Sequence, residues 1–264
     1  MSVAEFADKV VLITGGASGV GRAIADAFLA GGASVHVFDA ARTHVESFLH
    51  EHPGAGATVC DVGVREQVDA AFAEFAAHHK SLHVLVNNAG IAGPAGAVEH
   101  LDPEGWDRCI DVNLNGVFYV TRLAIPRMVG KGEGVIINLS SNAGLFPCPH
   151  RSPYVASKWA MIGLTKTWAM ELGPHGVRVN AICPTSVEGE RIENVIRDDA
   201  EKRGLTSDEI RDVYQRQSSM RTFVTAEDVA NMAVFLASDK ARRVSGQAIA
   251  VDGHTETLAN WLDH

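Results

Sequence analysis

The chain has 264 residues, of which 46% are hydrophobic and 21% are charged, and these proportions are ordinary for a globular enzyme. Its formal net charge of −9 argues against a nucleic-acid partner, because binding to phosphate groups requires a basic surface. The 4 cysteines lack CxxC pairing and the 12 histidines form no metal-ligand pattern, so no metal site is predicted.

The N-terminal stretch MSVAEFADKV lacks the basic start and the long apolar run of a signal peptide. Nowhere do about 18 apolar residues follow one another without charged or turn residues, so no membrane span is expected. We therefore expect a cytoplasmic protein with neither a membrane nor a nucleic-acid partner.

Short apolar runs alternate with helical patterns along the chain. Seven runs are interpreted as strands buried on both faces, because their apolar residues are almost continuous. They comprise residues 9–14, 34–39, 57–62, 82–90, 134–141, 177–184 and 247–253. This alternation predicts an α/β fold, in which residues 1–264 form a single Rossmann-like, doubly wound domain with a seven-stranded parallel sheet and helices on both faces.

Several helix starts are marked by capping residues. Asp102 and Ser152 each precede a proline, which suits the first position of a helix. Two capping boxes are expected further on, at residues 206–209 and 225–228. These signals predict where four of the helices begin.

The charged stretch 188–221 interrupts the alternation of strands and helices. Two groups of apolar residues each share one helical face, namely Ile192, Val195 and Ile196, and then Ile210, Val213 and Tyr214. We expect a substrate-lid insertion, since a long excursion after the carboxyl end of a strand often lines a site. A solvated surface insertion is the alternative.

The segment TGGASGVG, residues 14–21, follows the first strand and opens the first helix. Glycines let the backbone approach a pyrophosphate, and a helix N-terminus offers free N–H groups and positive potential. This context predicts a nucleotide site, whereas a tight turn without a ligand is the alternative. The predicted binding residues are Gly15, Ser18, Gly19, Val20 and Gly21.

Asp39 ends the second strand. A carboxylate at this place can accept both hydroxyls of an adenosine ribose and would repel a 2′-phosphate, so NAD is favoured over NADP. Arg42 lies close enough to moderate that preference, and Asp39 is also placed to cap the following helix. After the third strand, Asp61 and Val62 lie where an adenine ring would be bracketed.

Further motifs follow the glycine turn: NNAG (87–90), Asn113 in DVNLNG, INLSS (137–141) and YVASK (154–158). In this order they resemble the short-chain dehydrogenase/reductase family over nearly the whole chain. The resemblance implies a catalytic tetrad of Asn113, Ser141, Tyr154 and Lys158. It favours Ser141 over Ser140, because Ser141 lies 13 residues before Tyr154, the usual interval in the family.

The resemblance also implies cofactor contacts beyond the glycine turn. The residues Asn87, Ala89 and Gly90 would support the cofactor and the central sheet. Pro184 and Val187 match the family's loop beside the nicotinamide, where the Val187 N–H would bind the carboxamide.

Two residues of that loop depart from the family pattern. Thr185 replaces the usual glycine, and Gly189 stands where a threonine is common. The family also implies a homo-oligomer, a dimer or tetramer, that pairs through the helix around residues 103–130 and the helix of Tyr154. Trp168 and Met170 fit such an interface and fit a core equally well.

The residues themselves support proton transfer at Tyr154. Residues four apart on a helix share a face, so Lys158 places a positive charge near the phenol. This charge and that of an oxidised nicotinamide lower the pKa of Tyr154 from about 10, which makes it a general base for an alcohol or a general acid for a ketone. Lys158 is also placed to hold the nicotinamide ribose, and Ser141 to bind the reacting oxygen. Asn113 would bind a water or a backbone group and help to relay protons to Lys158.

The substrate is indicated by weaker signals. His150 and Arg151, just before the tyrosine, and Arg191 in the stretch 188–221 could hold a carboxylate or a polyol beside Ser141, or could be solvated loop charges. We expect an NAD-dependent oxidoreductase that acts on a secondary alcohol, with a sugar, sugar acid or hydroxy acid favoured. The alternatives are a 3-oxoacyl or steroid-type carbonyl reductase of the same family and a non-catalytic dinucleotide-sensing protein.

Overall fold

The computed structural model describes residues 5–258, so residues 1–4 and 259–264 of the predicted domain lie outside the described part. Seven parallel strands form one sheet in the order β3-β2-β1-β4-β5-β6-β7. The predicted fold class is therefore confirmed. The strands are β1 (Val10–Thr14), β2 (Ser34–Asp39), β3 (Gly56–Val59), β4 (Val84–Asn87), β5 (Gly134–Leu139), β6 (Val177–Pro184) and β7 (Ala248–Val251).

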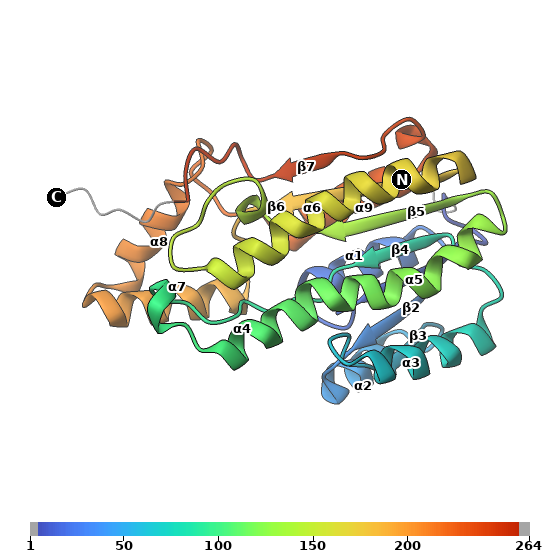
Figure 1. The fold of residues 1–264 in the computed structure, drawn as a ribbon, viewed down its shortest axis with the longest axis horizontal. Coiled ribbons are helices and arrows are strands. Elements are labelled where there is room, and N and C mark those ends of the chain that lie inside the picture. The colour runs from blue at the N-terminus through green and yellow to red at the C-terminus, as the bar shows by residue number, and fades with distance from the viewer. Residues whose placement is uncertain (1–4, 259–264) are drawn as a thin grey trace.

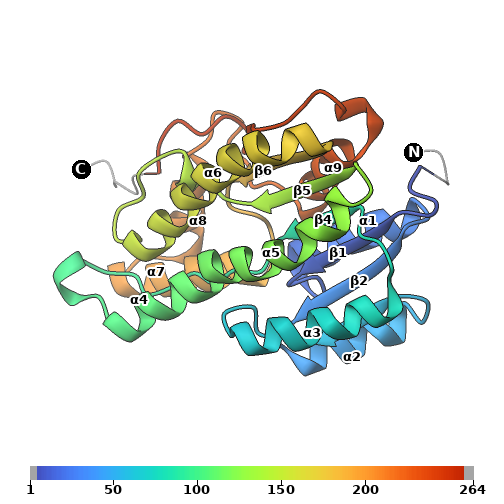
Figure 2. The ribbon, with the colours of Figure 1, turned by 45° about the vertical axis from the view of Figure 1, so that its right-hand side comes forward.

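Helices cover both faces of the sheet, as Figures 1 and 2 show. One face is covered by α1 (Gly19–Ala30), α2 (Arg42–Glu51) and α9 (Ala226–Ala237), and the other by α3 (Arg65–His78), α5 (Gly116–Val129) and α6 (Ser152–Leu172). Two hydrophobic clusters fill the two layers. Successive residues of β1 alternate between them, since Ile13 packs in the first and Leu12 in the second.

The predicted helix starts are confirmed at three of four places. Helix α4 (Pro103–Ile110) begins after Asp102, whose side chain accepts a hydrogen bond from the Gly105 N–H at 2.7 Å. Capping boxes at Thr206 and Thr225 open the helices α8 (Ser207–Gln215) and α9. The expected cap at Ser152 is wrong by one residue, because α6 already begins there and Arg151 holds the cap position.

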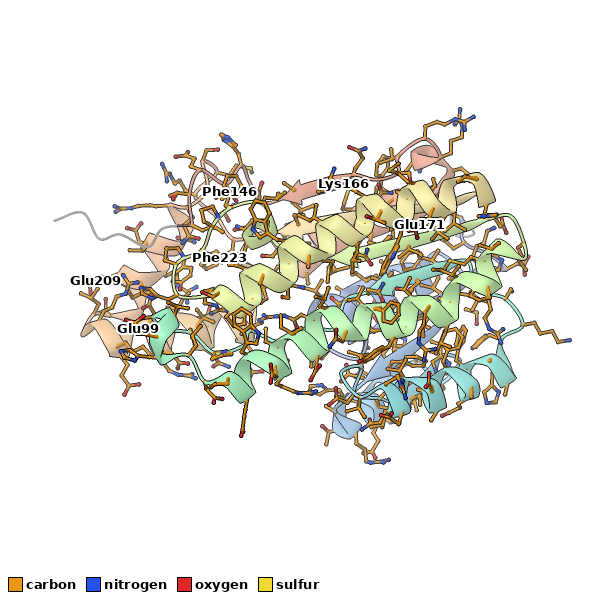
Figure 3. The ribbon with its side chains drawn as sticks, viewed as in Figure 1. Glu99, Phe146, Lys166, Glu171, Glu209 and Phe223 are labelled. Carbon is orange, nitrogen blue, oxygen red and sulfur yellow. The ribbon has the colours of Figure 1, made fainter. Side chains whose placement is uncertain are left out.

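Two amphipathic helices occupy the stretch 188–221, as the sequence predicts. Helices α7 (Glu190–Arg203) and α8 pack around a third hydrophobic cluster, built from Ile192, Ile196, Ala200, Ile210 and Phe223. They lie beyond the carboxyl ends of the strands, toward which the arrowheads in Figure 1 point. Figure 3 shows Phe223 and Glu209 at this end, together with Phe146 from the segment between β5 and α6. This region therefore has a small core separate from the two that flank the sheet.

Within residues 5–258, none of the helices is both long enough and apolar enough to span a bilayer. The same part of the chain holds no group of three or more acidic, histidine or cysteine side chains arranged to ligate a metal.

Candidate active site

The glycine turn after β1 leaves room for a ligand at the start of α1. Gly15 and Gly19 have positive φ angles of 59° and 53°, which side-chain-bearing residues rarely adopt. A Cβ on Gly21 would lie 2.0 Å from the carbonyl oxygen of Gly15, so only glycine fits there. The side chain of Ser18, the cap residue, does not cap the helix, and the first turn of α1 has no acidic residue. This cradle fits a pyrophosphate at a helix N-terminus.

The loop after β4 holds the glycine turn in place. Asn88 Nδ2 donates to the carbonyl oxygens of Thr14 and Gly15 at 3.0 and 2.9 Å. The Thr14 hydroxyl in turn accepts from the N–H groups of Asn88 and Ala89, both at 3.1 Å. Asn88 and Thr14 were missed by sequence reasoning, although both belong to its motifs at neighbouring strand ends.

The carboxylate of Asp39 is buried and lies against the glycine turn. Its Oδ2 accepts from the Ala17 N–H at 3.2 Å, and its Oδ1 accepts from the Ala41 N–H at 3.1 Å. The structure does not give Asp39 the capping role, because Ala41 is the cap residue of α2 and no side chain caps that helix. Asp39 therefore joins the end of β2 to the turn that opens α1.

Asp61 follows β3 and is held by its neighbours. Its Oδ1 accepts from the Gly63 N–H at 3.0 Å, and its Oδ2 accepts from Arg108 Nη2 at 2.5 Å. Val62 is buried in the cluster beneath α3 and α5. Asn87 is a structural link as well, since its Nδ2 donates to Thr121 and Asn138 inside the second layer.

Tyr154 and Lys158 lie one turn apart on α6. Lys158 Nζ is 5.6 Å from the centroid of the Tyr154 ring and donates to the Leu139 carbonyl oxygen at 2.7 Å. A Cβ on Gly90 would lie 3.6 Å from Nζ, so the loop after β4 passes close to this ammonium group. The lysine is therefore buried and fixed between β5 and that loop.

Ser141 follows β5, and its hydroxyl is among the groups that lower the pKa of Tyr154. Its Oγ also accepts from the Ala143 N–H at 3.1 Å and donates to Asn142 Oδ1 at 3.1 Å. Ser140 turns the other way and donates to the Lys158 carbonyl oxygen at 2.9 Å. Of the two serines, Ser141 is the one that acts on the pKa of the phenol.

Asn113 lies in a π-helical turn (Asp111–Asn115) between α4 and α5, where the sequence indicates an uninterrupted helix. Its Oδ1 accepts from the Ile91 N–H at 2.8 Å, and its Nδ2 donates to the Ile91 carbonyl oxygen at 3.0 Å. The same Nδ2 lies 3.2 Å from Ser157 Oγ on α6. The expected backbone partner of Asn113 is thus Ile91, and the asparagine braces the loop beside Lys158.

Positive charges surround the phenol. Burial by itself raises the pKa of Tyr154, but the charges of Lys158 and Arg191, the hydrogen bond with Ser141 and the charge of Arg151 outweigh it, so the pKa lies below its usual value. Burial likewise lowers the pKa of Lys158, and its proximity to Tyr154 partly opposes this effect. The guanidinium carbons of Arg151 and Arg191 lie 5.4 and 5.9 Å from the centroid of the ring.

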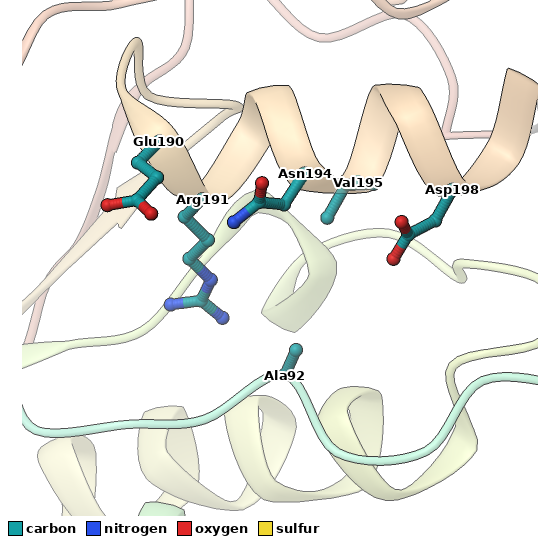
Figure 4. A pocket seen from close by; sticks show the side chains of 6 residues that line it. All are labelled: Ala92, Glu190, Arg191, Asn194, Val195 and Asp198. Carbon is teal, nitrogen blue, oxygen red and sulfur yellow. The ribbon is translucent and has the colours of Figure 1, made fainter.

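Of the predicted substrate residues besides Ser141, Arg151 and Arg191 converge on Tyr154, whereas His150 does not. Arg151 Nη2 donates to the Ala92 carbonyl oxygen at 3.2 Å. Arg191 extends from α7 toward Ala92, as Figure 4 shows, across a cavity of about 380 Å³. This cavity is lined by Ala92, Glu190, Arg191, Asn194, Val195 and Asp198. His150 is exposed on its loop, where its carbonyl oxygen accepts from the Gly96 N–H at 3.0 Å, so the cationic cluster is built without it.

The loop after β6 accommodates the unusual Thr185 without a positive φ angle. The Thr185 N–H donates to the Val251 carbonyl oxygen at 3.2 Å, and its hydroxyl accepts from Asn142 Nδ2 at 3.0 Å. Val187 pairs with Val224, and Gly189 takes a φ of 135° just before α7. The threonine thus belongs to a hydrogen-bond network behind Ser141.

Comparisons with known proteins agree with this geometry. The family model described as "Enoyl-(Acyl carrier protein) reductase" matches residues 15–254. The chain is 36% identical to a 3-oxoacyl-[acyl-carrier-protein] reductase from Thermotoga maritima, over 93% of this chain and 96% of the relative. It is 37% identical to a D-beta-hydroxybutyrate dehydrogenase from Rhizobium meliloti, over 93% and 97%.

Solved structures of dehydrogenases and reductases also resemble this chain over nearly its whole length. An NAD+-bound xylitol dehydrogenase superposes with a TM-score of 0.87 at 26% identity, over 95% of this chain and 99% of that one. An actinorhodin polyketide ketoreductase with NADPH gives 0.88 at 32% identity, over 93% and 96%. The chain belongs to the short-chain dehydrogenase/reductase family. It is an oxidoreductase that acts on alcohol or carbonyl groups with a nicotinamide dinucleotide.

Proposed function

We propose that the protein is an NAD-dependent dehydrogenase of a secondary alcohol in which Tyr154 is the general base, and the general acid in the reverse direction. The favoured substrate is a sugar acid, a hydroxy acid or a sugar. The observation that carries this proposal is the convergence of Lys158, Arg151 and Arg191 on the phenol of Tyr154.

The residues that would hold the cofactor are those of the predicted set. The glycine turn and the N-terminus of α1 would bind the pyrophosphate, and Asp39 would accept the adenosine ribose hydroxyls. Asp61 and Val62 would border the adenine, and Asn87, Ala89 and Gly90 would support the bound dinucleotide. Pro184 and Val187 would border the nicotinamide, which supplies the acceptor for the hydride that leaves the carbinol carbon.

The preference for NAD rests on Asp39. Both carboxylate oxygens are already fixed by backbone N–H groups at 3.1 to 3.2 Å, so the negative charge is held beside the glycine turn. A 2′-phosphate would meet this charge at short range, whereas a free ribose hydroxyl would donate to it.

Proton transfer would run through the tetrad. In oxidation, the hydroxyl proton of the substrate would pass to the Tyr154 phenolate while Ser141 binds the same oxygen. Lys158 would stabilise the phenolate through its positive charge, which is one of the causes that lower the pKa of Tyr154. Asn113 would act through the loop that it braces at Ile91, beside the Lys158 ammonium group.

A carboxylate on the substrate would fit between Arg151 and Arg191. Neither arginine takes part in the ion pairs found among residues 5–258. The ion pairs in and around α7 and α8 use other arginines, namely Arg203 with Asp199, Arg211 with Glu193 and Arg216 with Asp212. Glu190, Asn194 and Asp198 line the same cavity and would accept hydrogen bonds from further hydroxyl groups. The stretch 188–221 would then be the lid over the substrate.

A 3-oxoacyl reductase is the second candidate. It is favoured by the identity with the 3-oxoacyl-[acyl-carrier-protein] reductase of Thermotoga maritima, which is nearly as high as that with the hydroxybutyrate dehydrogenase. Such an enzyme would need an open apolar path for an acyl chain, and Ala92 and Val195 would offer apolar surface to it in the cavity under α7, beside the charged groups.

We also propose that the protein forms a homo-oligomer, a dimer or tetramer, through α5 and α6. Phe118, Trp159 and Met170 on these helices are 51%, 50% and 81% exposed, which is costly in water for side chains of this size. Trp168 is buried in the core and has no part in such an interface. Light scattering on the purified chain measures the assembly directly.

The test of the main proposal is a nicotinamide-absorbance assay with NAD and NADP in parallel. The panel contains sugars, sugar acids, short hydroxy acids, steroids and 3-oxoacyl thioesters. We expect turnover with NAD and a hydroxy or sugar acid, and loss of turnover by a factor of roughly a thousand or more in Tyr154→Phe with NAD binding retained. Full activity of that variant, or turnover of the acyl thioesters alone, would reject the proposal.

A further inference from the structure

Ser157 connects the catalytic helix α6 to the side chain of Asn113. Its hydroxyl donates to the Tyr154 carbonyl oxygen, one turn back on the helix, at 2.7 Å. Its oxygen accepts from Asn113 Nδ2 at 3.2 Å. A hydroxyl carries one proton, and because that proton is used on the helix backbone, Ser157 meets Asn113 as an acceptor. Both side chains are fully buried, so water does not readily replace either partner.

The amide of Asn113 has no second oxygen partner for this proton. Its Oδ1 accepts from the Ile91 N–H at 2.8 Å, and one Nδ2 proton goes to the Ile91 carbonyl oxygen at 3.0 Å. The other Nδ2 proton is left for Ser157. Cys109 Sγ lies 3.4 Å from the same nitrogen, but a thiol sulfur is a weak acceptor. Without the hydroxyl of Ser157, a buried N–H group would therefore lose its oxygen acceptor, which is unfavourable.

The loop that contains Ile91 touches the candidate site on both sides of that residue. A Cβ on Gly90 would lie 3.6 Å from Lys158 Nζ. The carbonyl oxygen of Ala92 accepts from Arg151 Nη2 at 3.2 Å, and Ala92 also lines the cavity under α7. Whatever fixes Ile91 therefore also fixes how this loop lies against the ammonium group and the guanidinium group.

A second hydroxyl on α6 makes the same two kinds of hydrogen bond away from the phenol. Thr165 Oγ1 donates to the Met161 carbonyl oxygen at 2.8 Å and accepts from Asn138 Nδ2 at 2.9 Å. Thr165 is fully buried as well. Its partner Asn138 lies within β5 and binds Asn87 of the neighbouring strand. The two hydroxyls thus differ in what their asparagine holds, a loop of the site in one case and the sheet in the other.

We propose that Ser157 is a positioning residue that orients the amide of Asn113. Through this amide it holds the loop of residues 90–92 against Lys158. When the hydroxyl is removed, the amide keeps its two bonds to the loop but loses its bond to α6, so amide and loop shift together relative to the helix that carries Tyr154. The role in catalysis rests on the proposed function, because it assigns this loop to the proton-transfer site.

The first measurement is amide hydrogen exchange, read by mass spectrometry, on the whole protein without substrate. Thr165→Val is the matched control for Ser157→Ala, since it removes the corresponding two hydrogen bonds from the same helix. Both variants should lower the unfolding temperature by about 2 to 6 °C. Only Ser157→Ala should speed exchange over residues 88–93, by about tenfold, because Asn113 protects the Ile91 N–H in the wild type. Unchanged exchange of this loop in Ser157→Ala, or equally fast exchange in Thr165→Val, would overturn the proposal.

Steady-state kinetics measure the consequence for the reaction. In Ser157→Ala we expect kcat for alcohol oxidation to fall about tenfold while the KM for NAD stays within about twofold. Thr165→Val should keep both constants. Ser157→Thr retains a hydroxyl that reaches the helix backbone, so it should recover most of the lost rate and of the lost protection. A wild-type kcat in Ser157→Ala, or an equal loss in Thr165→Val, would contradict the positioning role.

A double-mutant cycle separates this role from general packing. In an Asn113→Ala background, Ser157→Ala should cause no further increase in exchange over residues 88–93, because the two side chains act on the loop as one unit. Additive effects would mean that Ser157 acts on the loop by another route and would reject the proposal. Absence of turnover in the wild type would reject the proposed function instead, and the exchange measurements, which need no turnover, still decide whether Ser157 holds the loop.

Discussion

The pKa of Tyr154 is set by effects that oppose one another. Burial opposes its ionisation, yet the nearby charges of Lys158, Arg191 and Arg151 and the hydrogen bond of Ser141 together lower its pKa. Lys158 and Arg151 belong to α6 and its N-terminus, whereas Ser141 follows β5 and Arg191 lies on α7. The acid strength of Tyr154 is therefore a property of the assembled site.

The charge of Arg191 gives a prediction on pH dependence. Alcohol oxidation needs the phenolate, so the rate rises with pH through the pKa of Tyr154. Arg191→Gln removes a positive charge, raises that pKa and should move the midpoint of the kcat profile to higher pH by about half to one unit. Arg197→Gln, the same change at another exposed arginine of α7 that is not among the groups acting on the pKa of Tyr154, should leave it in place. Coincident profiles for wild type and Arg191→Gln would remove this arginine from the electrostatics of the site.

Asp39 gives a prediction on the cofactor. Asp39→Ala removes the charge that would repel a 2′-phosphate and the acceptor for the ribose hydroxyls. The ratio of kcat/KM for NAD to that for NADP should fall by roughly tenfold or more, which corresponds to one lost charged hydrogen bond. Steady-state kinetics with both cofactors measure this ratio. If it does not move, the ribose assignment of Asp39 is wrong.

At the scale of elements, the site depends on close contacts of the loop after β4 with the β1–α1 turn and with the π-helical turn at Asn113. The turn between β1 and α1 packs Gly21 onto the backbone of Gly15, and Asn88 of the loop after β4 fixes both Thr14 and Gly15. The π-helical turn at Asn113 similarly connects α5 to the next part of that loop at Ile91. Both contacts hold the loop after β4, one at Asn88 and the other at Ile91.

Gly21 and Gly19 offer a matched pair for testing the turn. Gly21→Ala would place a Cβ 2.0 Å from a carbonyl oxygen, so the turn must open. We expect a loss of stability of about 3 kcal/mol or more and no measurable binding of NAD. Gly19→Ala meets no atom within 4 Å, and we expect only about 1 to 2 kcal/mol from its positive φ angle. Thermal unfolding and calorimetric NAD binding measure both, and equal effects at the two positions would contradict the assigned close approach.

On the scale of the whole molecule, two large hydrophobic clusters stabilise the sheet and a small third cluster stabilises α7 and α8. The clusters on the two faces of the sheet hold the strands whose carboxyl ends carry Asp39, Ser141 and Pro184. The third cluster holds α7 and α8 together with far fewer buried side chains. The stretch 188–221 should therefore open more easily than the rest of the chain.

Ile196 tests this division, because it is fully buried in the third cluster. Ile196→Ala should destabilise α7 and α8 by about 2 to 4 kcal/mol and speed amide hydrogen exchange over residues 190–215, with β4 and β5 unaffected. The KM for substrate should rise while NAD binding is retained. Ile24→Ala, in the core beneath α1, is the control and should lower the stability of the whole molecule. Uniform exchange in both variants would show that α7 and α8 unfold only with the sheet.

The sequence by itself determined the fold class, the seven strands, the family and the residues of the predicted tetrad. These follow from local signals, since apolar runs and glycine turns specify strands, and motifs at strand ends converge wherever a parallel sheet brings those ends together. Only the tertiary structure decided that Asn113 binds Ile91, that Arg151 and Arg191 converge on one ring while His150 does not, and that Asn142, Thr185 and Thr255 meet behind Ser141. The hydrogen bonds of Asn142 to Thr185 and Thr255 join residues that are 43 and 113 positions apart. Such bonds depend on the register of strands and the course of loops, and no short stretch of sequence specifies either.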